Sequence, residues 1–79
     1  RLFLLKVDLG EEQRQIVAGI RDSYTAEELV GKQLVLVANL HPAKIRGTES
    51  HGMLLAGRTE DKVILLSPSE PIPNGTRLS

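Results

Sequence analysis

The sequence contains no cysteine and no tryptophan, and its only aromatic side chains are Phe3 and Tyr24. Without cysteine, disulfide bonds, cysteine-ligated zinc or iron–sulfur sites and cysteine nucleophiles are excluded. With so few aromatic rings, the core must be aliphatic, and binding of unstructured nucleic acid by stacking of successive bases is disfavoured. We expect an intracellular, cytoplasmic protein.

Long apolar runs and an excess of charge are also lacking. The longest uninterrupted apolar run is 34–38, whereas a membrane-spanning helix needs roughly 20 residues. We therefore expect no membrane span. Ten basic and ten acidic residues cancel, so overall charge gives no argument for binding nucleic acid. Any such function has to rest on local features.

A chain of 79 residues has room for one small core, so we expect a single domain over 1–79. The sequence starts at Arg1 and opens directly on the apolar run 2–5, which indicates a module cut from a larger protein. Its hydrophobic and charged contents lie in the ordinary globular range.

The N-terminal part predicts a β-hairpin followed by a short helix. Residues 2–9 alternate apolar and polar side chains at period two, 10–12 form a turn, and 14–18 form the returning strand. Thr25 and Glu28 have the spacing of a capping box, which predicts a helix of one to two turns, packed by Tyr24 and Leu29 and ended by Gly31.

The second half of the chain predicts further strands. Residues 33–40 are aliphatic with little alternation, as in a strand buried on both faces. Residues 51–57 and 62–66 are two more strands around a polar turn at 58–61, and the Pro-rich tail ends in a possible short strand at 77–78. The order predicts an all-β fold with one short helix: a five-stranded Greek-key OB barrel whose first strand would precede Leu2.

The segment 39–52 is the candidate binding region, because loops on a rigid scaffold often carry function. Lys44 and Arg46 are two residues apart, so in an extended chain they would project to the same side, toward adjacent phosphates. Asn39 and Ser50 offer neutral groups for a base edge or a 2′-hydroxyl. Spacing alone leaves open that the two cations are simply solvated.

Catalytic and metal sites are disfavoured. Ser50 and His51 are neighbours that would point to opposite faces of a strand, which is unsuitable for a nucleophile–base pair with Asp61. His41 and His51 lack a third ligand at a recognisable spacing, and no phosphate-binding glycine loop is present. We expect no enzyme activity, no metal and no cofactor.

Four stretches resemble the tRNA-binding domain of methionyl-tRNA synthetase C-terminal extensions, free-standing bacterial tRNA-binding proteins and the endothelial monocyte-activating polypeptide, and the resemblance as a whole extends over nearly the whole chain. The longest runs from Val37 to Ala56 and includes Asn39-Leu40-His41-Pro42-Ala43-Lys44-Ile45-Arg46-Gly47. The others are 6–10, 16–20 and 24–32.

The resemblance implies an OB-fold that binds tRNA by its shape and is appended to the catalytic domain of a synthetase, most naturally the methionyl enzyme. It implies RNA contacts at Asn39, Lys44, Arg46, Ser50, Lys6 and Arg14, and structural roles for Gly47, Gly52 and Met53. The sequence departs from the family at Ala18, where a serine is usual, and it lacks the family's first strand. The alternative is a dimerisation or docking module, because the family's bacterial members commonly form homodimers, with Ile64, Leu65, Leu66 and Ile72 as interface candidates.

Overall fold

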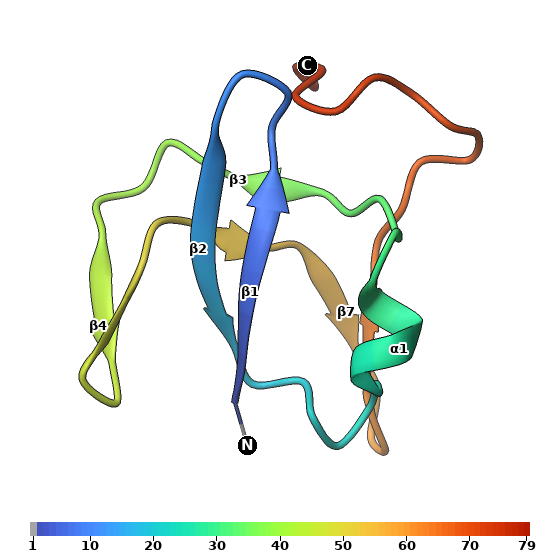
Figure 1. Ribbon diagram of the computed structural model, residues 1–79. Helices are drawn as coiled ribbons and strands as arrows, with labels where there is room; N and C mark the ends of the chain where they lie inside the picture. The colour runs from blue at the N-terminus through green and yellow to red at the C-terminus, as the bar shows by residue number, and fades with distance from the viewer. Residues whose placement is uncertain (1) are drawn as a thin grey trace.

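The computed structural model describes residues 2–79 as short antiparallel strands with one short helix (Figure 1). The strands pair two by two, β1 with β2, β3 with β6, β4 with β5 and β7 with β8. This confirms a mostly-β fold with almost no helix, consistent with a small OB-type barrel. The elements are β1 Phe3–Asp8, β2 Gln13–Ala18, α1 Ala26–Leu29, β3 Leu36–Val37, β4 Ala43–Ile45, β5 Thr48–Ser50, β6 Met53–Leu54, β7 Ala56–Arg58 and β8 Val63–Leu65.

The β1–β2 hairpin forms as predicted. Its register pairs Phe3 with Ala18 at the open end and Asp8 with Gln13 beside the turn. The turn is closed by Gly10, whose φ is +88° and whose N–H donates to the Asp8 carboxylate at 2.7 Å. The period-two pattern and a glycine at the left-handed position were both visible locally, which is why this element was predictable.

Helix α1 also begins as the capping box predicts. The Glu28 N–H donates to Thr25 Oγ1 at 3.3 Å, and the Thr25 N–H donates to the Glu28 carboxylate at 2.8 Å. This backbone hydrogen bond from Thr25 lowers the pKa of the Glu28 carboxyl below its usual value. The helix has only one turn, and the chain then turns through Gly31 at φ +83°. No helix within residues 2–79 is long and apolar enough to cross a membrane.

The core is aliphatic, as expected. Ile16 at the centre of β2 is fully buried, and Tyr24, Leu34 and Phe3 pack against the buried cluster from its margins. The Tyr24 hydroxyl accepts from the Leu65 N–H at 3.0 Å, which holds the segment before α1 against β8. The buried hydrophobic residues are Ile16, Val17, Ala18, Ile20, Leu29, Leu54 and Leu65.

Three predicted strands differ in the structure. The expected strand 33–40 is reduced to β3, which pairs with the two residues of β6, and residues 33–38 are only half-buried. The expected strand 51–57 is divided into β6 and β7, and 77–78 is not a strand. The strands form four two-stranded ladders, so the predicted count of five is not reproduced.

Candidate nucleic-acid interface

The segment expected to be a loop forms a second hairpin, β4–β5, which lies beside β2 (Figure 1). Its register pairs Lys44 with Glu49 and Ile45 with Thr48, so Arg46 and Gly47 alone form the turn. Both have positive φ, 54° and 82°, as a two-residue type I′ turn requires. The base of the hairpin rests on β2, where the His51 N–H donates to the Gln15 carbonyl at 2.8 Å.

Lys44 and Arg46 are both exposed on this hairpin, but not by the predicted geometry. Lys44 lies in extended β4, whereas Arg46 lies in the turn with left-handed backbone. Lys44 and Arg46 therefore do not share one extended strand, and the prediction that they project to the same side of such a strand is wrong. Asn39 is exposed in the segment between β3 and β4.

Ser50 was expected to contact RNA, but the structure buries it. The residue is 3% exposed. Its Oγ accepts from the Val17 N–H and donates to the Gly52 carbonyl, both at 3.0 Å. Its hydroxyl thus joins β2 to the chain after β5, and this placement argues against a contact with a ligand. Neither bond could be inferred from a serine in a loop-like sequence.

Arg14 is likewise engaged within the protein. Its Nη1 donates to the carbonyls of Ala38 at 2.6 Å and His51 at 3.1 Å, and its Nε lies 3.5 Å from the Glu12 carboxylate. The side chain therefore fixes the two ends of the segment 38–51 against β2. Lys6 is exposed on β1, opposite Gln15 in the register, and so shares a face with it.

Structural roles were expected for Gly47, Gly52 and Met53, and the structure constrains these three positions to different degrees. Gly52 is buried with φ +146°, and a Cβ there would lie 2.9 Å from the Val37 carbonyl oxygen, so this position requires glycine. Gly47 has φ +82° but open space around it, so only its backbone conformation favours glycine. Met53 is 48% exposed, so its side chain contributes little to the core.

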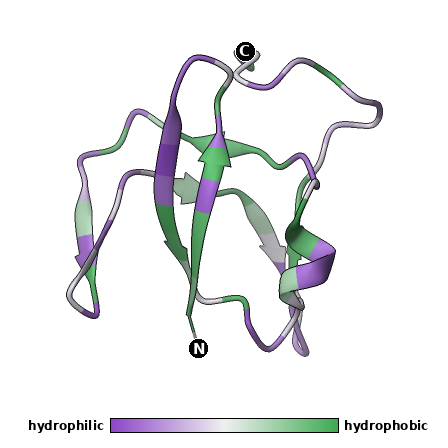
Figure 2. Cartoon of the chain, in the orientation of Figure 1, coloured by the Kyte–Doolittle hydropathy of each residue, from purple (hydrophilic) through white to green (hydrophobic). Residues whose placement is uncertain are grey.

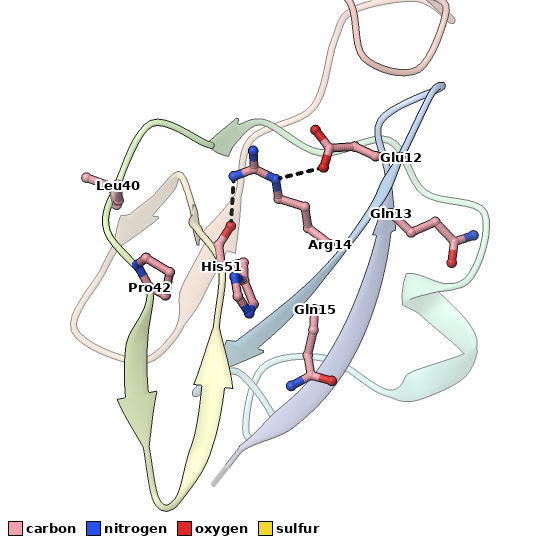
Figure 3. A pocket seen from close by; sticks show the side chains of 7 residues that line it. All are labelled: Glu12, Gln13, Arg14, Gln15, Leu40, Pro42 and His51. Atoms are coloured by element: carbon pink, nitrogen blue, oxygen red, sulfur yellow. Dashed lines mark hydrogen bonds and ion pairs between the residues drawn. The ribbon is translucent and has the colours of Figure 1, made fainter.

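A pocket of about 520 Å³ lies where β2, the 39–42 segment and the end of β5 meet (Figure 3). Sequence reasoning missed this site, because its walls come from distant parts of the chain. It is lined by Glu12, Gln13, Arg14, Gln15, Leu40, Pro42 and His51.

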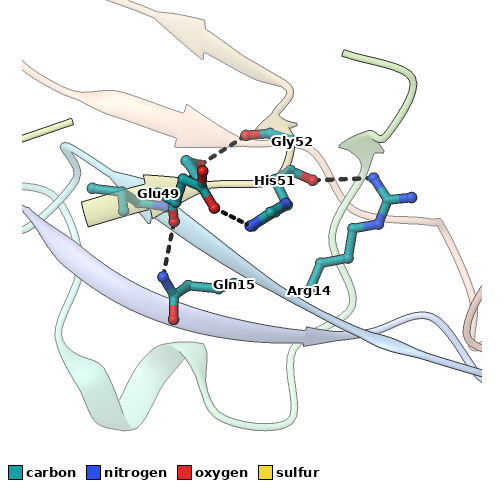
Figure 4. A network of polar contacts seen from close by, with 7 residues as sticks. Arg14, Gln15, Glu49, His51 and Gly52 are labelled. Atoms are coloured by element: carbon teal, nitrogen blue, oxygen red, sulfur yellow. Dashed lines mark hydrogen bonds and ion pairs between the residues drawn. The ribbon is translucent and has the colours of Figure 1, made fainter. Parts of the chain in front are cut away.

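Polar contacts order one side of this pocket (Figure 4). The His51 Nε2 lies 3.0 Å from the Glu49 carboxylate, and the Gln15 Nε2 donates to the Glu49 carbonyl at 2.9 Å. The polar half of β2 borders this region, while its other half is hydrophobic (Figure 2). Among residues 2–79 no group of three or more histidine or acidic side chains is arranged to hold a metal ion.

Comparisons with known proteins match the whole chain to part of the methionine–tRNA ligases. It is 51% identical over 78 residues to the methionine–tRNA ligase of Archaeoglobus fulgidus, a match that covers 99% of this chain and 12% of the ligase. The methionine–tRNA ligase of Thermotoga maritima is 53% identical over 79 residues, again with only 13% of its length covered. The chain thus spans about an eighth of these curated relatives.

Solved structures agree with the fold. The crystal structure of a MetRS-related protein from Pyrococcus horikoshii superposes with a TM-score of 0.90 at 48% identity, covering 100% of this chain and 73% of that one. The chaperone CsaA of Bacillus anthracis superposes with a TM-score of 0.92 at 36% identity, with 99% and 73% covered. Residues 1–77 match the family described as "Putative tRNA binding domain", and the chain therefore belongs to this family.

Proposed function

We propose that this chain is a non-catalytic tRNA-binding domain, attached to the catalytic part of a cytoplasmic methionine–tRNA ligase, whose affinity for tRNA it raises. The observation that carries the proposal is the family match over 1–77, together with about 50% identity to one region of methionine–tRNA ligases. The matched family is defined by binding and not by a reaction. The parent enzyme's activity would thus reside outside these 79 residues.

The β4–β5 hairpin is the part of the surface best suited to RNA. Lys44 faces Glu49 across the hairpin, but the Glu49 carboxylate is paired with His51. The Lys44 ammonium makes no ion pair with any residue from 2 to 79, so it is available to a phosphate. With Arg46 exposed at the adjacent turn, the hairpin carries two cations outward although the whole chain is neutral.

Recognition of folded RNA by shape fits this surface better than recognition of single strands. Single-strand binders use rows of aromatic side chains, whereas duplex RNA is read through phosphates and 2′-hydroxyls. The exposed amide of Asn39 beside the hairpin supplies a neutral donor and acceptor for such hydroxyls, and Lys6 adds a further exposed cation on β1.

The proposal is tested by titrating the chain with unfractionated tRNA and with unstructured RNA of equal length at several salt concentrations. Tighter binding to tRNA is expected. Replacing Lys44 or Arg46 by alanine should weaken binding to all tRNAs alike and reduce the salt slope by about 0.9 or slightly less for each lost phosphate contact. Lys62→Ala, an exposed lysine in the β7–β8 turn, is the control. An unchanged slope in both hairpin variants contradicts the assignment.

A second candidate function, homodimerisation, is favoured by an exposed aliphatic strip on β6 to β8. Met53, Leu55, Ile64 and Leu66 are 48%, 46%, 41% and 43% exposed. The Leu66 N–H donates to the Leu55 carbonyl, so these two residues lie opposite each other at the end of the β7–β8 ladder. Leu65, which the sequence also suggested for an interface, is instead buried in the core.

Sedimentation equilibrium tests this second function. A dimer that dissociates when Leu55 and Leu66 are replaced by serine would support it, with Leu78→Ser, an exposed leucine outside the strip, as control. A monomer at high protein concentration would contradict it.

A further inference from the structure

We infer that the pocket at the edge of β2 is a binding site for one unpaired nucleobase of the RNA, stacked on the His51 imidazole. This inference rests on the proposed function and adds a base contact to the phosphate contacts described above. It is carried by the position, the composition and the charge of the pocket (Figure 3).

The walls of the pocket suit a flat heterocycle. Leu40 and Pro42 supply apolar surface on one side, and β2 supplies the other, with His51 between them (Figure 3). The His51 side chain is 42% exposed, so part of its ring is free to stack. Histidine is one of the side chains on which splayed-out RNA bases stack, and a volume of about 520 Å³ admits a ligand of this size.

The charges in the pocket disfavour a phosphate. The Arg14 guanidinium is already held by two backbone carbonyls and lies 3.5 Å from the Glu12 carboxylate. The His51 ring is paired with the Glu49 carboxylate. An incoming anion would meet the Glu12 carboxylate in the wall and the Glu49 carboxylate beside it, while Arg14, the cation among these lining residues, already lies next to Glu12. A neutral base would meet no such repulsion.

Hydrogen-bonding groups remain for the edge of a base. Gln15 gives one hydrogen of its Nε2 to the Glu49 carbonyl, which leaves its other amide hydrogen and its carboxamide oxygen for a ligand. The Glu12 carboxylate, 58% exposed, can accept from an exocyclic amino group. Arg14 acts here as a positioning residue, because its bonds to Ala38 and His51 set the distance between the walls.

The neighbouring surface would hold the nucleotide's backbone. Pro42 in the wall is followed within two residues by Lys44, which lies exposed on β4 with no ion pair to residues 2–79. A nucleotide with its base in the pocket could therefore place its phosphate toward this ammonium. Base and phosphate contacts would then belong to one nucleotide.

The first test compares His51→Ala, His51→Phe and His41→Ala in tRNA titrations. His41 is an exposed histidine of the same segment that is not among the residues lining the pocket, so its variant is a matched control. His51→Ala should weaken binding about 5- to 150-fold with an unchanged salt slope, because stacking and not a phosphate contact is lost. His51→Phe should bind nearly as the unaltered chain does. If His51→Ala binds tRNA as tightly as the unaltered chain, the pocket does not bind a base. If His51→Ala and His51→Phe weaken binding equally, stacking on His51 is also refuted, and the loss of affinity is assigned to the broken pair between His51 and Glu49.

The second test needs no variant and so does not depend on the variants folding. Amide and imidazole NMR signals of the unaltered chain are followed during titration with AMP, CMP, GMP and UMP, and with ribose 5-phosphate. Shifts at Gln15 and His51 with nucleotides but not with ribose 5-phosphate are expected. Equal shifts with ribose 5-phosphate, or no shifts at millimolar nucleotide, would refute base binding in this pocket. Nucleotide shifts in a chain that binds no tRNA would instead refute the proposed function and leave the pocket standing.

Discussion

Replacing Ser50 by alanine tests whether the Ser50 hydroxyl stabilises the fold or contacts RNA. The Ser50 hydroxyl accepts from the Val17 N–H and donates to the Gly52 carbonyl, and all three residues are buried. Alanine has nearly the same shape but leaves both backbone groups without a partner. A buried unsatisfied group costs about 1–3 kcal/mol, with the carbonyl at the lower end, so the sum is about 2–4 kcal/mol.

The assay for this prediction is urea and thermal unfolding followed by circular dichroism. For a domain of this size a loss of 2–4 kcal/mol lowers the unfolding midpoint by roughly 10–30 °C. Affinity for tRNA, measured well below that midpoint, should change little. Ser69→Ala, an exposed serine in the tail, should leave both quantities unchanged. An unfolding free energy within about 0.5 kcal/mol of the unaltered chain, combined with weaker tRNA binding, would refute the reasoning and make Ser50 an RNA contact.

Two further predictions concern backbone and pH. Gly52→Ala should destabilise the fold by about 3 kcal/mol or more, since it combines left-handed strain with a Cβ placed 2.9 Å from the Val37 oxygen. The added Cβ of Gly47→Ala would meet open space, so this variant should lose only about 1–2 kcal/mol of unfolding free energy. Equal losses for Gly47→Ala and Gly52→Ala in urea unfolding would contradict this difference. The lowered pKa of Glu28 means that its ionised form stabilises the folded state, a contribution present above about pH 4.5 and lost as pH falls through the lowered pKa. Glu28→Gln retains the cap but should show a smaller loss of stability between pH 7 and pH 3, and an identical loss would exclude this contribution.

Local patterns in the sequence were sufficient for the β1–β2 hairpin and for the start of α1. Alternation over 2–9, a glycine in the turn and the Thr25–Glu28 spacing each specify their structure within a few residues. The family also followed from the sequence, because the run 37–56 is long and specific, and the match over 1–77 confirms it.

Tertiary structure decided what the side chains of the candidate interface do. Ser50 and Arg14 have the chemistry of RNA contacts, but Ser50 is paired with backbone groups of β2 and of Gly52, and Arg14 with carbonyls 24 and 37 residues away. The pocket at His51 likewise joins β2 to a wall formed about 25 residues later in the chain. Turns and caps involve neighbours and so leave a trace in the sequence, whereas burial and long-range hydrogen bonds depend on which segments meet, and that is fixed only when the chain has folded.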